Sequence, residues 1–241
     1  MAFNWQSPPK GYLKMNTDAS CKGNPGKASY GGIIRDESGG WVKGFHGKLP
    51  GLYTPLEAEA WAIIQGLNLV KKFGFRKVLV ETDSVGAMQL FSFRHLHQDH
   101  PMKDVIEEGL EILVEYECVI VHTRREGNEC ADKLAELGGR QMRDCNVIHT
   151  PPTEVVKLLL KDRFGDNWRR VTRLSQHPLW ALPLKTIESY ANSAPNPIKS
   201  LPLHHHPPPV CAPLMPPIGF LHHQPSSRGY LLQPPSLVIL H

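Results

Sequence analysis

Four acidic positions in this sequence lie where a predicted strand ends or a predicted helix begins: Asp18, Glu57 or Glu59, Asp83 and Asp132. The ends of central strands and the starts of adjoining helices meet at one edge of a mixed α/β sheet, so these carboxylates should converge. Converging carboxylates repel one another unless a divalent cation neutralises them, and an all-oxygen ligand set suits Mg²⁺ or Mn²⁺. Helix capping or the helix dipole could explain each residue alone. The combination predicts a metal site.

The elements that must position these residues are predicted from apolar periodicity and turn signals. Strands are expected over 12–18, 30–35, 41–45, 78–80 and 118–122. Helices are expected over 55–72, 84–91, 102–116 and 128–142, with a turn at 23–26 and a loop at 94–101. Three strands followed by alternating helices and strands predict the α/β class. The sheet is expected to be mixed and five-stranded, with helices on both faces.

The formal net charge of +4 is unevenly distributed. Residues 171–241 hold 14 of the 22 prolines, 7 of the 13 histidines and three of the four net charges. Because this segment cannot bury enough apolar surface to offset its ordering entropy, we expect a disordered tail there. The expected organisation is an N-terminal extension (1–9), one domain (10–143), a linker that can form an amphipathic helix over 153–164 (144–170), and the tail. The domain is nearly neutral, so charge does not identify its partner.

Several protein classes are excluded by composition. The sequence contains no apolar run near the roughly 20 residues that span a membrane, and residues 1–10 lack the apolar centre of a signal peptide. The five cysteines are odd in number and form no CxxC pair, which argues against a disulfide framework or a structural zinc site. We therefore expect an intracellular monomer, in the nucleus or the cytoplasm.

Four short motifs occur in a fixed order along the domain. They are DASCKGNPG (18–26), LEAEAWA (56–62), ETDS (81–84) and HTRREGNECADKLA (122–135). In this order they resemble the motifs of ribonuclease H, and the resemblance extends over about residues 10–143. It is strongest to the ribonuclease H-like domains of plant proteins related to retroelement reverse transcriptases. The resemblance implies the ribonuclease H-like fold.

The resemblance also implies a ligand set for Mg²⁺, with Mn²⁺ as an alternative: Asp18, Glu59, Asp83 and Asp132. Periodicity alone leaves Glu57 and Glu59 open, since both flank the apolar stripe of the helix. Glu59 is favoured because Ala58 and Ala62 match the family's frame around its catalytic glutamate. His122 precedes Asp132 by ten residues, as does the family's mobile histidine, which assists proton transfer or product release.

The implied activity is hydrolysis of the RNA strand of RNA–DNA hybrids by a metal-dependent endonuclease with a two-metal-ion mechanism. Gly23, Asn24 and Thr54 match positions that contact the nucleic acid in bacterial relatives. Bacterial relatives carry asparagines just before the second motif, where this chain has residues 53–56, and some carry a dense basic segment that is missing here. These departures favour an alternative, a catalytically weak or inactive nucleic-acid-binding module derived from a retroelement ribonuclease H.

Overall fold

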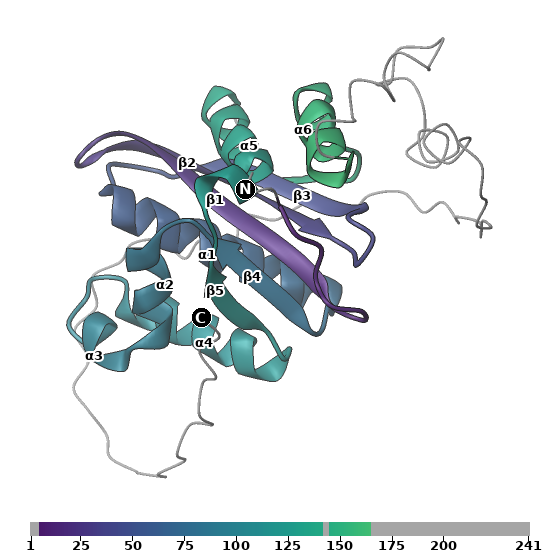
Figure 1. The fold of residues 1–241 in the computed structure, drawn as a ribbon. Helices are drawn as coiled ribbons and strands as arrows, with labels where there is room; N and C mark the ends of the chain where they lie inside the picture. The colour runs from purple at the N-terminus through teal and green to yellow at the C-terminus, as the bar shows by residue number, and fades with distance from the viewer. Residues whose placement is uncertain (1–4, 142–144, 165–241) are drawn as a thin grey trace, which may run out of the picture. The chain divides into compact units, whose positions relative to one another are not determined.

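The computed structural model describes residues 5–141 and 145–164, which form a mixed sheet with helices on both faces (Figure 1). Its strands lie in the order β5-β4-β1-β2-β3-β6. Their bounds are β1 Leu13–Gly23, β2 Gly26–Arg35, β3 Trp41–Lys48, β4 Val78–Thr82, β5 Val119–His122 and β6 Asn146–Ile148. Strands β1, β2 and β3 pair antiparallel, whereas β4 pairs parallel with β1, and β5 with β4. The predicted α/β class is confirmed.

Strand β1 is longer than expected. It continues to Gly23 and pairs with β2 up to the Gly23↔Gly26 register, so Asp18 lies in the middle of the strand and not at its end. In the second half of β1, residues 19–21 are half-buried and residues 22–23 are exposed, so this part lacks the apolar alternation that would have revealed it. The predicted turn at 23–26 joins the two strands. Gly23 has φ 115°, a conformation that glycine adopts without steric cost.

Helix α1 (Pro55–Phe73) begins with a capping box and packs on β1 and β2. The Thr54 hydroxyl accepts a hydrogen bond from the Glu57 backbone N–H at 3.2 Å, and the Glu57 carboxylate accepts one from the Thr54 N–H at 2.8 Å. Further along the helix, Gly66 lets the backbone approach the sheet. A Cβ there would lie 2.6 Å from Sδ of Met15, so the helix position depends on this glycine.

Helices α2 (Val85–Ser92) and α4 (Lys103–Glu115) pack beside α1 on the same face of the sheet. The expected loop at 94–101 was partly wrong, because Arg94–His97 forms the one-turn helix α3. The His97 ring is buried, and its Nδ1 donates a hydrogen bond to the Leu90 carbonyl at 2.6 Å. This contact folds the segment back onto α2.

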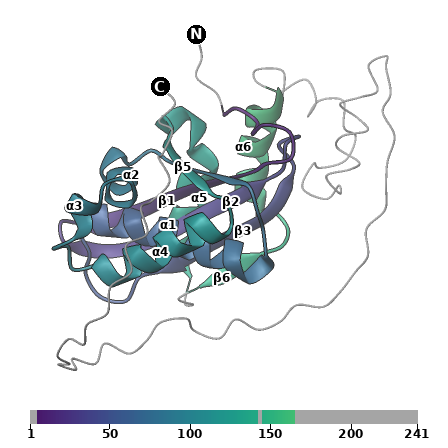
Figure 2. The same cartoon turned by 90° about the horizontal axis from the view of Figure 1, so that it is seen from below.

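The opposite face is covered by α5 (Glu129–Arg140) and α6 (Thr153–Phe164), as the two views show (Figure 1, Figure 2). Helix α5 follows the short 3₁₀ turn Arg125–Gly127 and lies on β1, β2 and β3. It approaches β2 so closely that a Cβ on Gly31 would lie 2.2 Å from the backbone nitrogen of Ala135. The helix expected over 153–164 is present as α6 and packs on α5.

The sheet has six strands, one more than the five expected. The additional strand β6 pairs antiparallel with β3, Val147 opposite Phe45. Three residues are too few to show an alternating pattern, so periodicity could not reveal this strand. Both β6 and α6 lie within the segment 144–170 that we expected to act as a linker.

Part of the expected N-terminal extension packs against the sheet. Trp5, within residues 1–9, is buried, and its indole N–H donates to Oδ1 of Asn16 at 2.9 Å. The predicted tail, 171–241, lies outside the described residues. Of the helices in the described ranges, none combines the length and the apolar character needed to cross a bilayer.

Candidate metal centre

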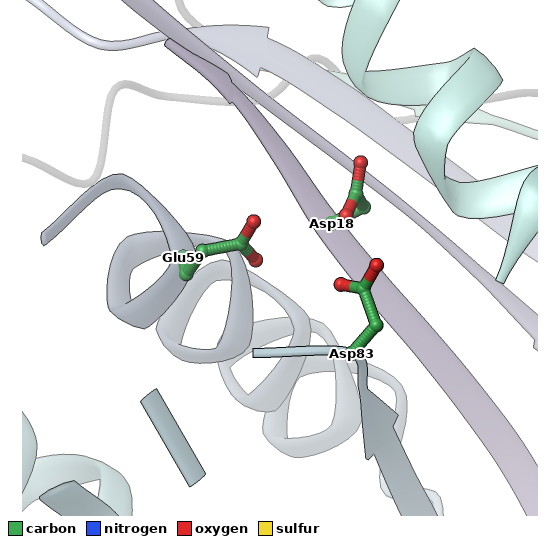
Figure 3. Close-up of side chains that lie close together, drawn as sticks. All are labelled: Asp18, Glu59 and Asp83. Atoms are coloured by element: carbon green, nitrogen blue, oxygen red, sulfur yellow. The ribbon is translucent and has the colours of Figure 1, made fainter. Parts of the chain in front are cut away.

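Three of the four predicted carboxylates converge, each from a different element (Figure 3). Asp18 extends from the middle of β1, Glu59 from the second turn of α1, and Asp83 follows the end of β4. One oxygen from each carboxylate lies within 4.8 Å of the others. The parallel register places Thr17 opposite Thr82, so the residue after each is brought to the same place.

Burial and mutual repulsion make the charged state of this cluster costly. Burial, followed by repulsion from Glu59, Asp83 and Asp132, raises the pKa of Asp18 to about 10. Burial and the Asp83 charge raise the pKa of Glu59 to about 8. A divalent cation between the carboxylates would offset their mutual repulsion.

Glu57 and Glu59 point in different directions from the first turns of α1. The Glu57 carboxylate turns back to accept hydrogen bonds from the backbone N–H and hydroxyl of Thr54, both at 2.8 Å. Glu59 instead accepts a backbone N–H of Ala19 and points toward Asp18 (Figure 3). Its buried Oε2 has no hydrogen-bond partner among the described residues. A buried carboxylate oxygen without a partner is costly, and an all-oxygen set that includes it fits Mg²⁺ or Mn²⁺.

The fourth carboxylate and the predicted histidine lie at the rim of the cluster. Asp132 is exposed in the first turn of α5 and is not part of the three-residue group, yet its charge raises the pKa of Asp18 and Glu59. His122 is the exposed last residue of β5. It pairs in register with Thr82, which places it beside the segment that carries Asp83.

The residues expected to contact substrate lie on two joined segments. Gly23 and Asn24 are exposed in the β1–β2 turn. The end of that turn is tied to the residue before Thr54 by two backbone hydrogen bonds, Gly26 N–H to Tyr53 O at 2.8 Å and Tyr53 N–H to Gly26 O at 2.9 Å. The turn is therefore held against the N-terminus of α1. The Thr54 hydroxyl itself is engaged in the capping box.

Asn128 has a role that the sequence did not reveal. It stands at the N-cap position of α5, as predicted, but its side chain makes no capping hydrogen bond. The amide is buried, and its Nδ2 donates to the Thr17 carbonyl at 3.0 Å and to Oδ1 of Asp18 at 3.5 Å. Asparagine is equally suited to a cap and to a buried anchor, so the residue type could not distinguish the two roles.

Arg125 was also missed. Its Nε lies 3.6 Å from Oδ2 of Asp83 although the side chain is 92% exposed, and its charge lowers the pKa of Glu59. The only signal in the sequence was its position between His122 and Asn128 in the fourth motif. It supplies a cation beside a cluster that is otherwise acidic.

Comparisons with known proteins identify similar sequences and a similar fold. The sequence model of a family described as reverse transcriptase-like matches residues 16–138. The chain is 32% identical over 176 residues to a ribonuclease H protein of Arabidopsis thaliana, a match that covers 71% of this chain and 28% of that relative. It is also 32% identical over 149 residues to the ribonuclease H of Bordetella avium, with 55% of this chain and 93% of that protein covered.

A solved structure with the same fold is that of RNase H1 from the halophilic archaeon Halobacterium salinarum. Its TM-score is 0.50 at 27% identity, over 54% of this chain and 98% of that one. The chain thus spans only 28% of the plant relative but nearly all of the two microbial proteins. Because the family match begins in the strand that carries Asp18 and ends in the helix that carries Asp132, the chain belongs to the reverse transcriptase-like family of ribonuclease H proteins.

Proposed function

We propose that this protein is a metal-dependent endonuclease that hydrolyses the RNA strand of RNA–DNA hybrids. The observation that carries the proposal is the convergence of Asp18, Glu59 and Asp83 from three separate elements, with oxygens within 4.8 Å of one another. This arrangement carries an electrostatic cost, because burial and repulsion oppose the charges of Asp18 and Glu59. Residues kept together against an electrostatic cost point to a function.

The three carboxylates would hold the metal, with Asp132 approaching from the rim to complete the set. When bound, a pair of divalent ions in such a site supplies activation of a water molecule and stabilisation of the leaving oxygen. Asp18 would be the least mobile ligand, since it lies within β1 and receives the Asn128 amide. Glu59 would offer Oε2, the oxygen that lacks a partner among the described residues.

The remaining residues would bind the nucleic acid and move protons. His122 is exposed next to the segment that carries Asp83. Its imidazole nitrogen would transfer a proton to the leaving oxygen, or the side chain would assist product release. The exposed side chain of Asn24 would contact the nucleic-acid backbone, with Gly23 allowing the turn to approach it closely. Thr54 would support this surface by fixing the start of α1. RNA would be distinguished from DNA at its 2′-hydroxyl group.

Cleavage of a labelled RNA–DNA hybrid in Mg²⁺ or Mn²⁺ tests the proposal. Asp83→Asn should abolish cleavage, because it removes a ligand charge and keeps the side-chain size, whereas Asp99→Asn, at an exposed position in the turn after α3, should cleave as the wild type does. Single-stranded RNA, duplex DNA and duplex RNA should remain intact. A wild-type protein that binds hybrid but leaves it uncut in both metals would instead be the nucleic-acid-binding module. Full activity of Asp83→Asn would also refute the proposed chemistry.

A further inference from the structure

An arginine is completely buried between the two ends of the described chain. Arg35, the last residue of β2, is 1% exposed. Its NH1 donates to Oδ2 of Asp162 in α6 at 2.6 Å, and its guanidinium lies 3.7 Å from the centre of the Trp5 ring. Both partners lie outside the range 16–138 that the family shares. A buried guanidinium needs a charged partner, and α6 supplies it.

The same guanidinium orients a buried asparagine. Arg35 NH2 donates to Oδ1 of Asn16 at 2.8 Å, and the Trp5 indole N–H donates to the same oxygen at 2.9 Å. Two donors fix the amide oxygen of Asn16 on this side, so its NH2 group must face the other way. There Nδ2 donates to the Glu81 carboxylate at 2.9 Å and to Oδ1 of Asn128 at 3.2 Å.

Asn128 connects Asn16 to the acidic cluster through a second oriented amide. Because Asn128 accepts at its oxygen from Asn16, its NH2 group is the end that faces Thr17 and Asp18, where it donates to Thr17 O and to Oδ1 of Asp18. If this amide were reversed, its oxygen would face the carboxylate of Asp18 and repel it. Arg35 therefore helps to fix the orientation of the Asn16 amide, and Asn16 fixes the orientation of the Asn128 amide, which donates to Asp18.

Helix α6 also holds the first turn of α5. Its buried Val155 and Leu159 pack in one cluster with residues of β2 and α5. The Lys161 ammonium contacts both carboxylate oxygens of Glu129 at 2.7 Å, and the Cys130 thiol donates to Oδ2 of Asp162 at 3.5 Å. Glu129 and Cys130 begin the helix that carries Asp132.

We propose that α6 supports the metal centre by supplying Asp162 as a positioning residue. Asp162 orients the Asp18 carboxylate through Arg35, Asn16 and Asn128. The inference rests on the proposed function only in taking Asp18 as a metal ligand. It implies that a fragment limited to the family-matched range lacks groups that the metal site requires. Groups that hydrogen-bond a metal ligand directly, as Asn128 does with Asp18, typically contribute 10- to 100-fold to metal affinity or activity.

The test measures Mn²⁺ affinity of the full chain by titration calorimetry, without nucleic acid. Asp162→Asn should weaken Mn²⁺ binding at least tenfold. The matched control is Glu154→Gln, the same acid-to-amide change at an exposed position of α6, which should leave affinity unchanged. Because Asp162→Asn leaves a buried charge without its partner and can unfold the protein, a second variant replaces both charges, Arg35→Met with Asp162→Leu. Apolar replacement of a buried ion pair commonly preserves stability.

The double variant separates positioning from stability. If the proposal is correct, it melts at or near the wild-type temperature but binds Mn²⁺ at least tenfold more weakly, because Asn16 has lost the charged one of its two orienting donors and keeps only the Trp5 indole. Wild-type Mn²⁺ affinity in the folded double variant overturns the proposal. Hybrid cleavage by the wild type is measured separately. A protein that binds Mn²⁺ and leaves hybrid intact refutes the proposed function, whereas the Mn²⁺ affinities of the variants still decide the positioning role of Asp162.

Discussion

Replacing Asp18 with asparagine should stabilise the metal-free protein while abolishing hybrid cleavage. The side chain is 6% exposed and faces two other carboxylates, and these surroundings raise its pKa from 3.8 to about 10. Asparagine has nearly the same shape, carries no charge, and can still accept the hydrogen bond from Asn128 at its oxygen. The variant therefore removes the electrostatic cost and keeps the packing.

The magnitude follows from the protonation that folding imposes. At pH 7 the unfolded chain ionises Asp18, whereas the folded metal-free protein keeps it protonated. Each pH unit above the ordinary pKa costs 1.36 kcal/mol, so the penalty is at most about 4 kcal/mol. Because Glu59 shares this repulsion, we expect a gain on the order of 2 to 4 kcal/mol. For a domain of this size that is a rise of roughly 5 to 15 °C in melting temperature.

The pH dependence has a definite sign. The folded-state pKa of Asp18 is raised, so the penalty is absent below the ordinary carboxyl pKa and grows as the pH rises toward the folded-state value. The difference in melting temperature between Asp18→Asn and the wild type should therefore be small near pH 4 and large at pH 8. Added Mn²⁺ should raise the melting temperature of the wild type and have little effect on the variant.

Thermal denaturation followed by circular dichroism, in chelator and then in Mn²⁺, measures these quantities. The matched control is Asp99→Asn, whose exposed carboxylate should show no such gain. If Asp18→Asn is no more stable than the wild type in chelator at pH 8, the electrostatic account of the site is wrong. A gain that is independent of pH would also contradict it, because the gain would then have another origin.

Three further predictions follow from particular contacts. Glu57→Gln should lower the free energy of unfolding by roughly 0.5 to 1 kcal/mol, because it weakens the capping box, and should keep the Mn²⁺ affinity. Glu59→Gln should instead lose Mn²⁺ binding. Calorimetry on both variants would contradict the assignment if the outcomes were reversed. Gly31→Ala should lower the free energy of unfolding by about 3 kcal/mol or more, because its methyl group would lie 2.2 Å from the α5 backbone. A denaturant midpoint equal to that of the wild type would disprove this close approach. His122→Ala should slow single-turnover cleavage about a hundredfold at unchanged Mn²⁺ affinity, and an unchanged rate would exclude a role in proton transfer.

The local pattern predicted elements best where one face of the element is buried. The capped helix α1 and the apolar strand β4 were expected within one or two residues of their observed bounds. The pattern failed where an element is only partly buried or very short, as in the second half of β1 and in the three-residue β6. Periodicity records burial, so an element without a buried face leaves no trace in it.

The residue types and the order of the four motifs were enough for the sequence by itself to predict an acidic, oxygen-donor site on an α/β sheet. Periodicity alone left Glu57 and Glu59 open, and Glu59 was favoured only by the resemblance to the family's frame. The different orientations of Glu57 and Glu59, the position of Asp132 at the rim, and the buried path from Asp162 to Asp18 depend on distances between segments far apart in the chain. Such distances are set by strand register and helix packing, which only the tertiary structure specifies.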